Sequence, residues 1–233
     1  MPHYRVETQH PWPDSSFVGG LALVLTNLIL VFPVVHLAWL LRFDYAAALL
    51  TTMLASIAYH GCRAGFFCEY RFRDHQITDH IFVFLTLIYV ASRLAVRRSF
   101  FPRNVRLEYP EILLTARVAF FFAIVLPTVM ANMYNPESPL AALFGFGVPI
   151  AVVILGACVS GERLFYDVKF GLIGSGLFLV SVAFYACAPH SWYQWSHSIW
   201  HLLSMLSVYF IIFAADPPIR LLPGAQEAHI KPP

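Results

Sequence analysis

The chain has 233 residues, of which 59% are hydrophobic and only 12% are charged, and its formal net charge is +2. Soluble domains are about half apolar and about a quarter charged, so this composition is typical of a polytopic membrane protein and excludes an ordinary soluble domain. The small net charge also argues against a nucleic-acid partner, because proteins of that class carry a pronounced basic surface. The expected surroundings of the chain are therefore a lipid bilayer.

Long apolar runs divide the chain into predicted transmembrane helices. Each run has roughly the 17–25 residues that a helix needs to cross about 30 Å of hydrocarbon. In chain order, the predicted spans are 17–41, 45–61, 79–96, 111–131, 138–158, 169–188 and 197–215. The predicted fold class is all-α, a seven-transmembrane helix bundle that extends over residues 17–216.

Two terminal segments lie outside the predicted spans. Residues 1–16 are polar and aromatic, without the basic region and apolar core of a signal peptide, so we expect an exposed N-terminal tail. Residues 217–233 are rich in proline and predict a disordered C-terminal tail. The sequence between these tails contains no linker or repeat, which indicates a single domain.

Basic residues are distributed unequally between the two sides of the predicted bundle. One side collects nine of them: Arg42, Arg97, Arg98, Arg103, Arg106, Arg163, Lys169, Arg220 and Lys231. The other side collects four: Arg5, Arg63, Arg71 and Arg73. Because cytoplasmic loops carry an excess of Lys and Arg, we expect a cytoplasmic C-terminus and an N-terminus outside the cell or in a lumen.

Five polar or ionisable residues lie at the ends of predicted spans, where such groups are costly and commonly functional. Ser56 and His60 end the second span, Asp79 opens the third, and His197 and His201 begin the last. Side chains four residues apart project from one face of a helix. In the predicted orientation all five residues lie on the non-cytoplasmic side, so they are expected to form one cluster.

The residue types in this cluster indicate zinc chemistry. Three imidazoles and one water are the usual ligands of a catalytic zinc ion, and a zinc-bound water can lose its proton near neutral pH. We expect His60, His197 and His201 to bind zinc. Asp79 would orient or deprotonate the water, and Ser56 would hydrogen-bond to the water or to a developing oxyanion.

Other interpretations of these residues stay open at this point. A single histidine at a helix end is often only an interfacial residue, and a serine in a membrane helix usually bonds the backbone carbonyl four residues back. Asp74 competes with Asp79, which we prefer because it adjoins the apolar run. A disulfide among Cys62, Cys68 and Cys187 is compatible with their predicted outer location, without an assigned pair.

The pattern Ser56-x-x-x-His60, then Asp79, then His197-x-x-x-His201 on a seven-helix chain resembles the CREST superfamily of membrane proteins. This superfamily includes alkaline ceramidases, progestin and adipoQ receptors and myomaker-like proteins. The resemblance covers nearly the whole chain by architecture, while its specific signal comes from these five residues. It implies a zinc ion bound by the three histidines, with the serine and the aspartate around the water.

Within this superfamily, the chain is most similar to the myomaker-like branch. The similarity lies in the His60-Gly61-Cys62 corner, in a further Cys68 in the loop that follows, and in the His-Ser-Ile-Trp-His run at 197–201. That branch suggests a role in membrane remodelling or fusion.

Two classes of function follow from the sequence. The first is a zinc-dependent integral-membrane hydrolase that cleaves an amide or ester bond of a lipid, with ceramide-like amides favoured. The second is a non-enzymatic remodelling protein or receptor, in which zinc braces the second, third and seventh spans. In both cases the expected cofactor is zinc and the expected partner is a membrane lipid, while assembly with further copies of the chain stays open.

The predicted orientation can be tested with terminal tags. An N-terminal tag should be accessible from outside the cell or from a lumen, and a C-terminal tag only from the cytoplasm, because of the unequal distribution of basic residues. Antibody labelling of intact and permeabilised cells measures this directly. Reversed labelling would keep the five residues together and would move them to the cytoplasmic leaflet.

Overall fold

The computed structural model describes residues 17–66, 68, 72–98, 110–135, 140, 143–151, 153–154, 165, 167–187 and 192–215. All regular structure in these ranges is helical, as the all-α class predicts. The two predicted terminal tails lie outside the described residues. The elements are α1 (Phe17–Leu28), α2 (Val31–Trp39), α3 (Phe43–Arg63), α4 (Phe72–Arg98), α6 (Pro110–Tyr134), the π-helix η1 (Leu143–Gly147), α9 (Val168–Cys187) and α10 (Tyr193–Ala215).

Within the described residues, three helical stretches are long and apolar enough to cross a membrane. They are Phe17–Trp39, which joins α1 and α2, then Val168–Tyr185 in α9 and Tyr193–Ala215 in α10. These stretches support the assignment of the chain to the membrane proteins. They correspond to the first, sixth and seventh predicted spans; the number of spans and their orientation remain predictions.

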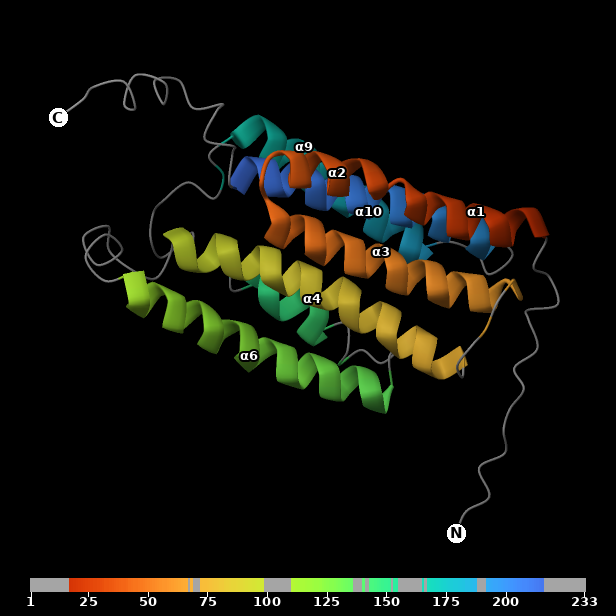
Figure 1. Cartoon of the computed structure of the whole chain (residues 1–233), viewed down its shortest axis with the longest axis horizontal. Coiled ribbons are helices and arrows are strands. Elements are labelled where there is room, and N and C mark those ends of the chain that lie inside the picture. The colour runs from red at the N-terminus through yellow and green to blue at the C-terminus, as the bar shows by residue number, and fades with distance from the viewer. Residues whose placement is uncertain are drawn as a thin grey trace, which may run out of the picture.

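The helices run side by side, and α3 lies in the middle of the bundle. Figure 1 shows α3 between α1, α2, α9 and α10 on one side and α4 and α6 on the other, in agreement with its packing against α1, α2 and α4. The N-terminus of α1, the C-terminus of α3 and the N-termini of α4 and α10 meet at the same end of the bundle (right in Figure 1). Ring contacts of Phe17 with Phe66 and of Tyr59 with Phe72 tie this end together.

The first predicted span is one apolar run in the sequence but two helices in the structure. Pro33 has no N–H to donate to the carbonyl of Ile29, four residues before it. That carbonyl instead accepts the N–H of Phe32 at 3.2 Å, and Leu30 N–H bonds to the carbonyl of Asn27 at 3.1 Å. The α-helical ladder is therefore interrupted between α1 and α2.

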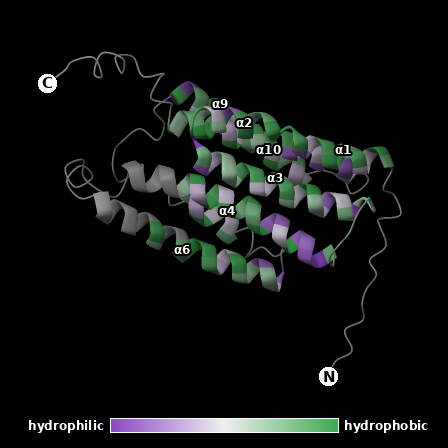
Figure 2. Ribbon diagram, viewed as in Figure 1, coloured by the Kyte–Doolittle hydropathy of each residue, from purple (hydrophilic) through white to green (hydrophobic). Residues whose placement is uncertain are grey.

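Two helices begin earlier than the hydropathy of the sequence predicts. The third predicted span opens at Asp79, but α4 begins at Phe72, and α10 begins at Tyr193, four residues before His197. Figure 2 shows that hydrophilic residues gather where α4 begins. An apolar run marks only the hydrocarbon part of a helix, so a polar first turn is missed. Asp79 and His197 thus lie about two turns and one turn inside their helices.

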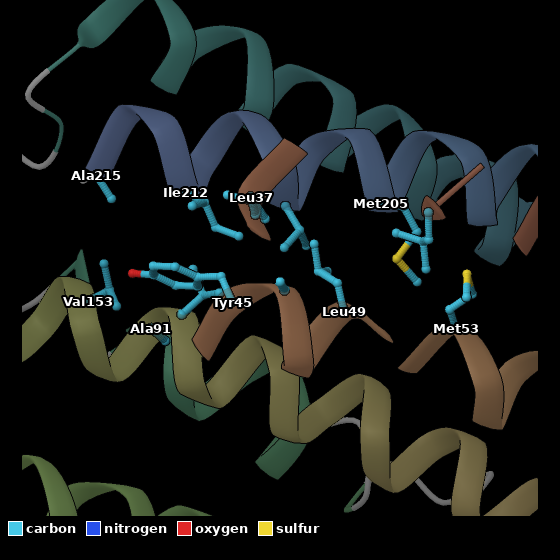
Figure 3. Packing of buried hydrophobic residues seen from close by; sticks show 13 residues of the cluster. Leu37, Tyr45, Leu49, Met53, Ala91, Val153, Met205, Ile212 and Ala215 are labelled. Carbon is cyan, nitrogen blue, oxygen red and sulfur yellow. The ribbon is translucent and has the colours of Figure 1, made fainter. Parts of the chain in front are cut away.

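An apolar core joins α2, α3, α4 and α10. Figure 3 shows Leu37, Leu49, Ala91 and Ile212 between these helices, and each has less than a tenth of its surface exposed.

Between α3 and α4 the contact is also polar. Thr52 Oγ1 and Thr86 Oγ1 are 2.7 Å apart, and Thr86 Oγ1 donates to the carbonyl of Ala48 at 3.1 Å. Such hydrogen bonds hold helices together in lipid, where apolar side chains gain little from leaving the solvent.

Small residues let α9 approach α10 closely. Ser207 Oγ on α10 donates to the carbonyl of Gly174 on α9 at 2.8 Å. A Cβ atom at Gly174 would lie 2.8 Å from Ile211 Cγ1 and 3.1 Å from both Ile211 N and Ser207 O. The backbone of α10 therefore leaves no room for a side chain at this position.

Gly174→Ala should destabilise the α9–α10 pair by about 1–3 kcal/mol, because the added methyl group meets backbone atoms that cannot move independently. Thermal unfolding of the detergent-solubilised protein measures the change. Gly176→Ala is the matched control, since a Cβ there meets no atom within 4 Å. Equal losses of thermal stability in both variants would contradict the close approach at Gly174.

Candidate metal centre

Three buried imidazoles from α3 and α10 meet between these helices. Nitrogen atoms of His60, His197 and His201 lie within 4.8 Å of one another, and the three side chains are 0%, 8% and 0% exposed. The ring centroids are 4.6 to 5.0 Å apart. The Nε2 atoms of His60 and His201 are separated by only 2.9 Å. The structure thus brings together the three histidines that the sequence singles out.

The end of α3 fixes the position of His60. The N–H of Phe66 donates to the carbonyl of Gly61 at 3.0 Å, and the N–H of Gly65 donates to the carbonyl of Cys62 at 3.1 Å. This pair of bonds is a Schellman motif, which needs a left-handed residue after the helix, and Gly65 supplies it with φ of 76°. The motif ends α3 one turn after His60.

Helix α1 holds α3 and α10 side by side at the level of this end. Gly19 of α1 packs against Gln194 of α10, and a Cβ at Gly20 would lie 2.8 Å from the Cβ of Ala64, just after α3. On α10, His197 and His201 are one turn apart and share a face. The cluster therefore depends on α1 and α3 and on α10, which is far from both in the sequence.

The donor set fits a metal ion. Across a tetrahedral zinc with bonds of about 2.0–2.1 Å, two ligand nitrogens are roughly 3.3 Å apart, close to the observed separation of the His60 and His201 nitrogens. The Nδ1 atoms of the same two rings are buried without a hydrogen-bond partner. Imidazole suits several first-row metals, so the cluster indicates a metal site and not a particular element.

Ser56 and Asp79 lie beside the histidines. Ser56 is one turn before His60 on α3, and both Ser56 and Asp79 are buried, with exposures of 0% and 4%. Their side chains are close enough to interact. However, neither Ser56 Oγ nor Asp79 Oδ1 forms a hydrogen bond of good geometry. A buried carboxyl oxygen without a hydrogen bond is costly, which is typical of a functional residue.

The two aspartates that compete in the sequence have different surroundings. Asp74 lies in the first turn of α4, where it is exposed, and its backbone carbonyl accepts a hydrogen bond from Thr78 Oγ1 at 2.7 Å. Asp79 is buried on the same helix and is close enough to Tyr193 to interact with it electrostatically. The geometry therefore favours Asp79 as the carboxylate of the site.

The sequence analysis misses three residues of the site, Tyr59, Arg63 and Tyr193. It counts Arg63 only in the distribution of basic residues. Arg63 Nη1 donates to the hydroxyls of Tyr59 at 3.0 Å and Tyr193 at 2.7 Å. The Tyr193 ring stacks on His197, with centroids 4.8 Å apart and ring planes 25° apart. The spacing contains a signal, because Arg63 follows His60 by three residues and Tyr193 precedes His197 by four.

Asn27 is a further buried polar residue near these helices. It is 0% exposed on α1, its Nδ2 donates to the carbonyl of Leu23 at 2.9 Å, and its Oδ1 has no partner. The buried face of α1 that carries it packs against α3 and α10. An asparagine inside an apolar run is the sequence signal that could have identified it.

A disulfide joins Cys62 to Cys68 and so ties the last turn of α3 to the loop that follows. This pairing answers the question that the sequence leaves open among three cysteines. His75 lies near the two sulfur atoms, but the disulfide occupies both of them, so this trio is not a second metal site in the oxidised protein.

No protein-family model matches the chain, and no curated protein is significantly similar to it. Conclusions about function therefore start from the geometry of the described residues.

Purified protein should contain about one metal ion per chain, and His201→Ala should remove most of it, because His201 is fully buried with Nε2 facing His60. Elemental analysis of protein prepared without chelator measures this content. His36→Ala is the control: His36 lies on α2, where its Nδ1 hydrogen-bonds to Tyr209 outside the cluster. Wild-type protein without any metal would contradict the site.

Proposed function

We propose that the chain is a zinc-dependent integral-membrane hydrolase that cleaves an amide or ester bond of a lipid, with ceramide-like amides the favoured class. The observation that carries the proposal is the buried cluster of three imidazoles with a serine and an aspartate beside it. The resemblance to the CREST superfamily adds support for zinc. The proposal includes seven spans within residues 17–216, with the N-terminus outside or in a lumen and the C-terminus in the cytoplasm.

Each residue has a role in this reaction. Zinc, when held by His60, His197 and His201, supplies a Lewis acid that polarises a carbonyl and makes a water acidic near neutral pH. Asp79 accepts a proton from the water while the water oxygen bonds to the carbonyl carbon. Ser56 donates a hydrogen bond to the carbonyl oxygen, where negative charge develops. When the C–N or C–O bond breaks, Asp79 returns the proton to the leaving nitrogen or oxygen.

The depth of the cluster supports a lipid substrate. His60 lies in the last turn of α3 and His197 in the second turn of α10. The cluster is therefore about 5–10 Å from these helix ends. The amide or ester carbonyls of membrane lipids lie at the boundary between headgroups and hydrocarbon, at a comparable depth below the surface.

A structural role for the metal is the second candidate, and one observation favours it. The contact between the Nε2 atoms of His60 and His201 joins α3 to α10 directly, so a bound metal would brace these helices. In that case the protein is a myomaker-like remodelling protein or a receptor. Hydrolysis and bracing would use the same three metal ligands, but only hydrolysis requires Asp79.

Asp79→Asn should lower lipid turnover by about 10²–10⁴-fold and leave the metal content nearly unchanged, because the amide keeps the size of the side chain but cannot accept the proton. Ser56→Ala should have a smaller effect, since it removes one hydrogen bond worth about 1–3 kcal/mol. The measurement is fatty-acid release from ceramides and lysolipids by detergent-solubilised protein.

Asp74→Asn is the matched control for this experiment, because Asp74 is exposed on the same helix. It should retain wild-type turnover. If wild-type protein with bound metal releases no fatty acid from any lipid in the panel, hydrolysis is rejected for those lipids. A fall in thermal stability in both Asp79→Asn and Ser56→Ala would then favour the brace.

A further inference from the structure

Asn27 is a buried polar residue of α1 whose hydrogen bonding is incomplete. Its side chain is 0% exposed, and its Nδ2 donates to the carbonyl of Leu23 on the same helix at 2.9 Å. Its Oδ1 has no hydrogen-bond partner. An unpaired acceptor inside an apolar bundle is costly, and such an exception calls for an explanation. A donor on a neighbouring helix would provide one.

Two close contacts set the level of Asn27 relative to its neighbours. Gly19 packs against Gln194 of α10, and Gly20 packs against Ala64, just after α3. Helix α1 runs parallel to α10 and antiparallel to α3, because its N-terminus meets the N-terminus of α10 and the C-terminus of α3 (Figure 1). All three helices rise equally per residue. Asn27 is therefore level with the residue eight after Gln194 on α10, and with the residue seven before Ala64 on α3.

His201 of the metal cluster lies within one residue of this level and on the face of α10 that contacts α1. It is seven residues, or two turns, after Gln194, which packs on α1. The next turn agrees with this register. Leu30, three residues after Asn27, belongs to the same buried cluster as Met205, four residues after His201. Asn27 and His201 are therefore neighbours across the contact between α1 and α10.

His201 has a nitrogen that needs an acceptor when its ring binds a metal. Its Nε2 lies 2.9 Å from Nε2 of His60 and is the nitrogen that would bind the ion. A neutral imidazole that binds through Nε2 carries its proton on Nδ1. Nδ1 of His201 is buried without a hydrogen-bond partner. Metal-binding histidines almost always donate this N–H to a carboxylate, a carbonyl or a water, which fixes the orientation of the ring.

The register selects His201 over His60 as the neighbour of Asn27. Nδ1 of His60 is also buried without a partner. However, His60 lies three residues along α3 from the level of Asn27, whereas His201 lies one residue from it on α10.

We propose that Asn27 is a positioning residue for the metal ligand His201: its Oδ1 accepts, through one bound water, the hydrogen bond that Nδ1–H of His201 donates. A buried water commonly joins two polar groups that lack a direct contact. This inference rests on the metal centre and not on the chemistry that the metal supports. The competing interpretation is that Asn27 only bonds the Leu23 carbonyl and packs α1 against its neighbours.

The test measures the zinc affinity of the detergent-solubilised full chain by competition with a chromophoric chelator. Asn27→Leu keeps the approximate size of the side chain and removes the acceptor. Its Kd for zinc should rise about 10–100-fold, the usual effect of losing the partner of a metal-binding histidine. Asn27→Asp keeps an oxygen acceptor, so it should bind zinc at least as tightly as the wild-type protein.

These two variants separate the two interpretations. The bond from Nδ2 to the Leu23 carbonyl is lost in both, so a purely structural role predicts the same zinc affinity in both. Equal Kd values for Asn27→Leu and Asn27→Asp would overturn the inference, as would a wild-type Kd in Asn27→Leu. Thermal stability of the metal-free proteins shows whether each variant is folded. If Asn27→Leu does not fold, Asn27→Met takes its place, because its more flexible side chain adapts to the site.

Asn132→Leu is the matched control. Asn132 is 0% exposed on α6, its Nδ2 donates to the carbonyl of Thr128 at 2.8 Å, and its Oδ1 has no hydrogen-bond partner. Its bonding thus repeats that of Asn27, but α6 packs against α4 and η1. Asn132→Leu should leave the Kd for zinc unchanged. A rise as large as that of Asn27→Leu would reveal a general effect of losing a buried asparagine and would overturn the inference.

Lipid turnover measured on the same preparations separates this inference from the proposed hydrolysis. A zinc affinity that depends on the acceptor at Asn27, without fatty-acid release from any lipid in the panel, would support the inference and count against hydrolysis. Turnover by a protein whose zinc affinity does not depend on Asn27 would do the reverse.

Discussion

The contact between His60 and His201 is the interaction on which the functional interpretation depends. Their Nε2 atoms are 2.9 Å apart although the residues are separated by 141 positions in the chain, and their Nδ1 atoms are buried without partners. Polar groups inside an apolar bundle are costly unless they are satisfied. A direct hydrogen bond satisfies Nε2 of His60 and Nε2 of His201, whereas a metal ion would bind one nitrogen from each of the three histidines. Metal binding would therefore engage one nitrogen of every ring in the cluster, which the single hydrogen bond does not.

The sequence predicts this cluster because two simple periodicities act together. The spacing of four residues places His197 with His201, and Ser56 with His60, on single helix faces, and the alternation of apolar runs places these faces at one end of the bundle. Other features depend on local backbone bonding or on long-range packing. To predict the break before Pro33, one must know which backbone carbonyl loses its hydrogen-bond partner. The early start of α4 is missed because its first turns contain polar residues, which hydropathy assigns to a loop.

Long-range packing also explains why sequence reasoning misses Arg63 as a site residue. Taken alone, it is one arginine in a loop-like stretch, and its distribution with other basic residues indicates only topology. Its relation to the histidines becomes visible when Tyr193, which is 130 positions away, contacts both Arg63 and His197. The last turn of α3 contains His60, the disulfide-bonded Cys62 and Arg63. The turn at Gly65 ends the helix just after these residues.

Hydrolysis explains more of these residues than bracing does. A metal that only joins α3 to α10 needs the three imidazoles, and it does not need a carboxyl group that accepts a proton. A reaction that moves a proton from water gives Asp79 a role, which is why we place hydrolysis first.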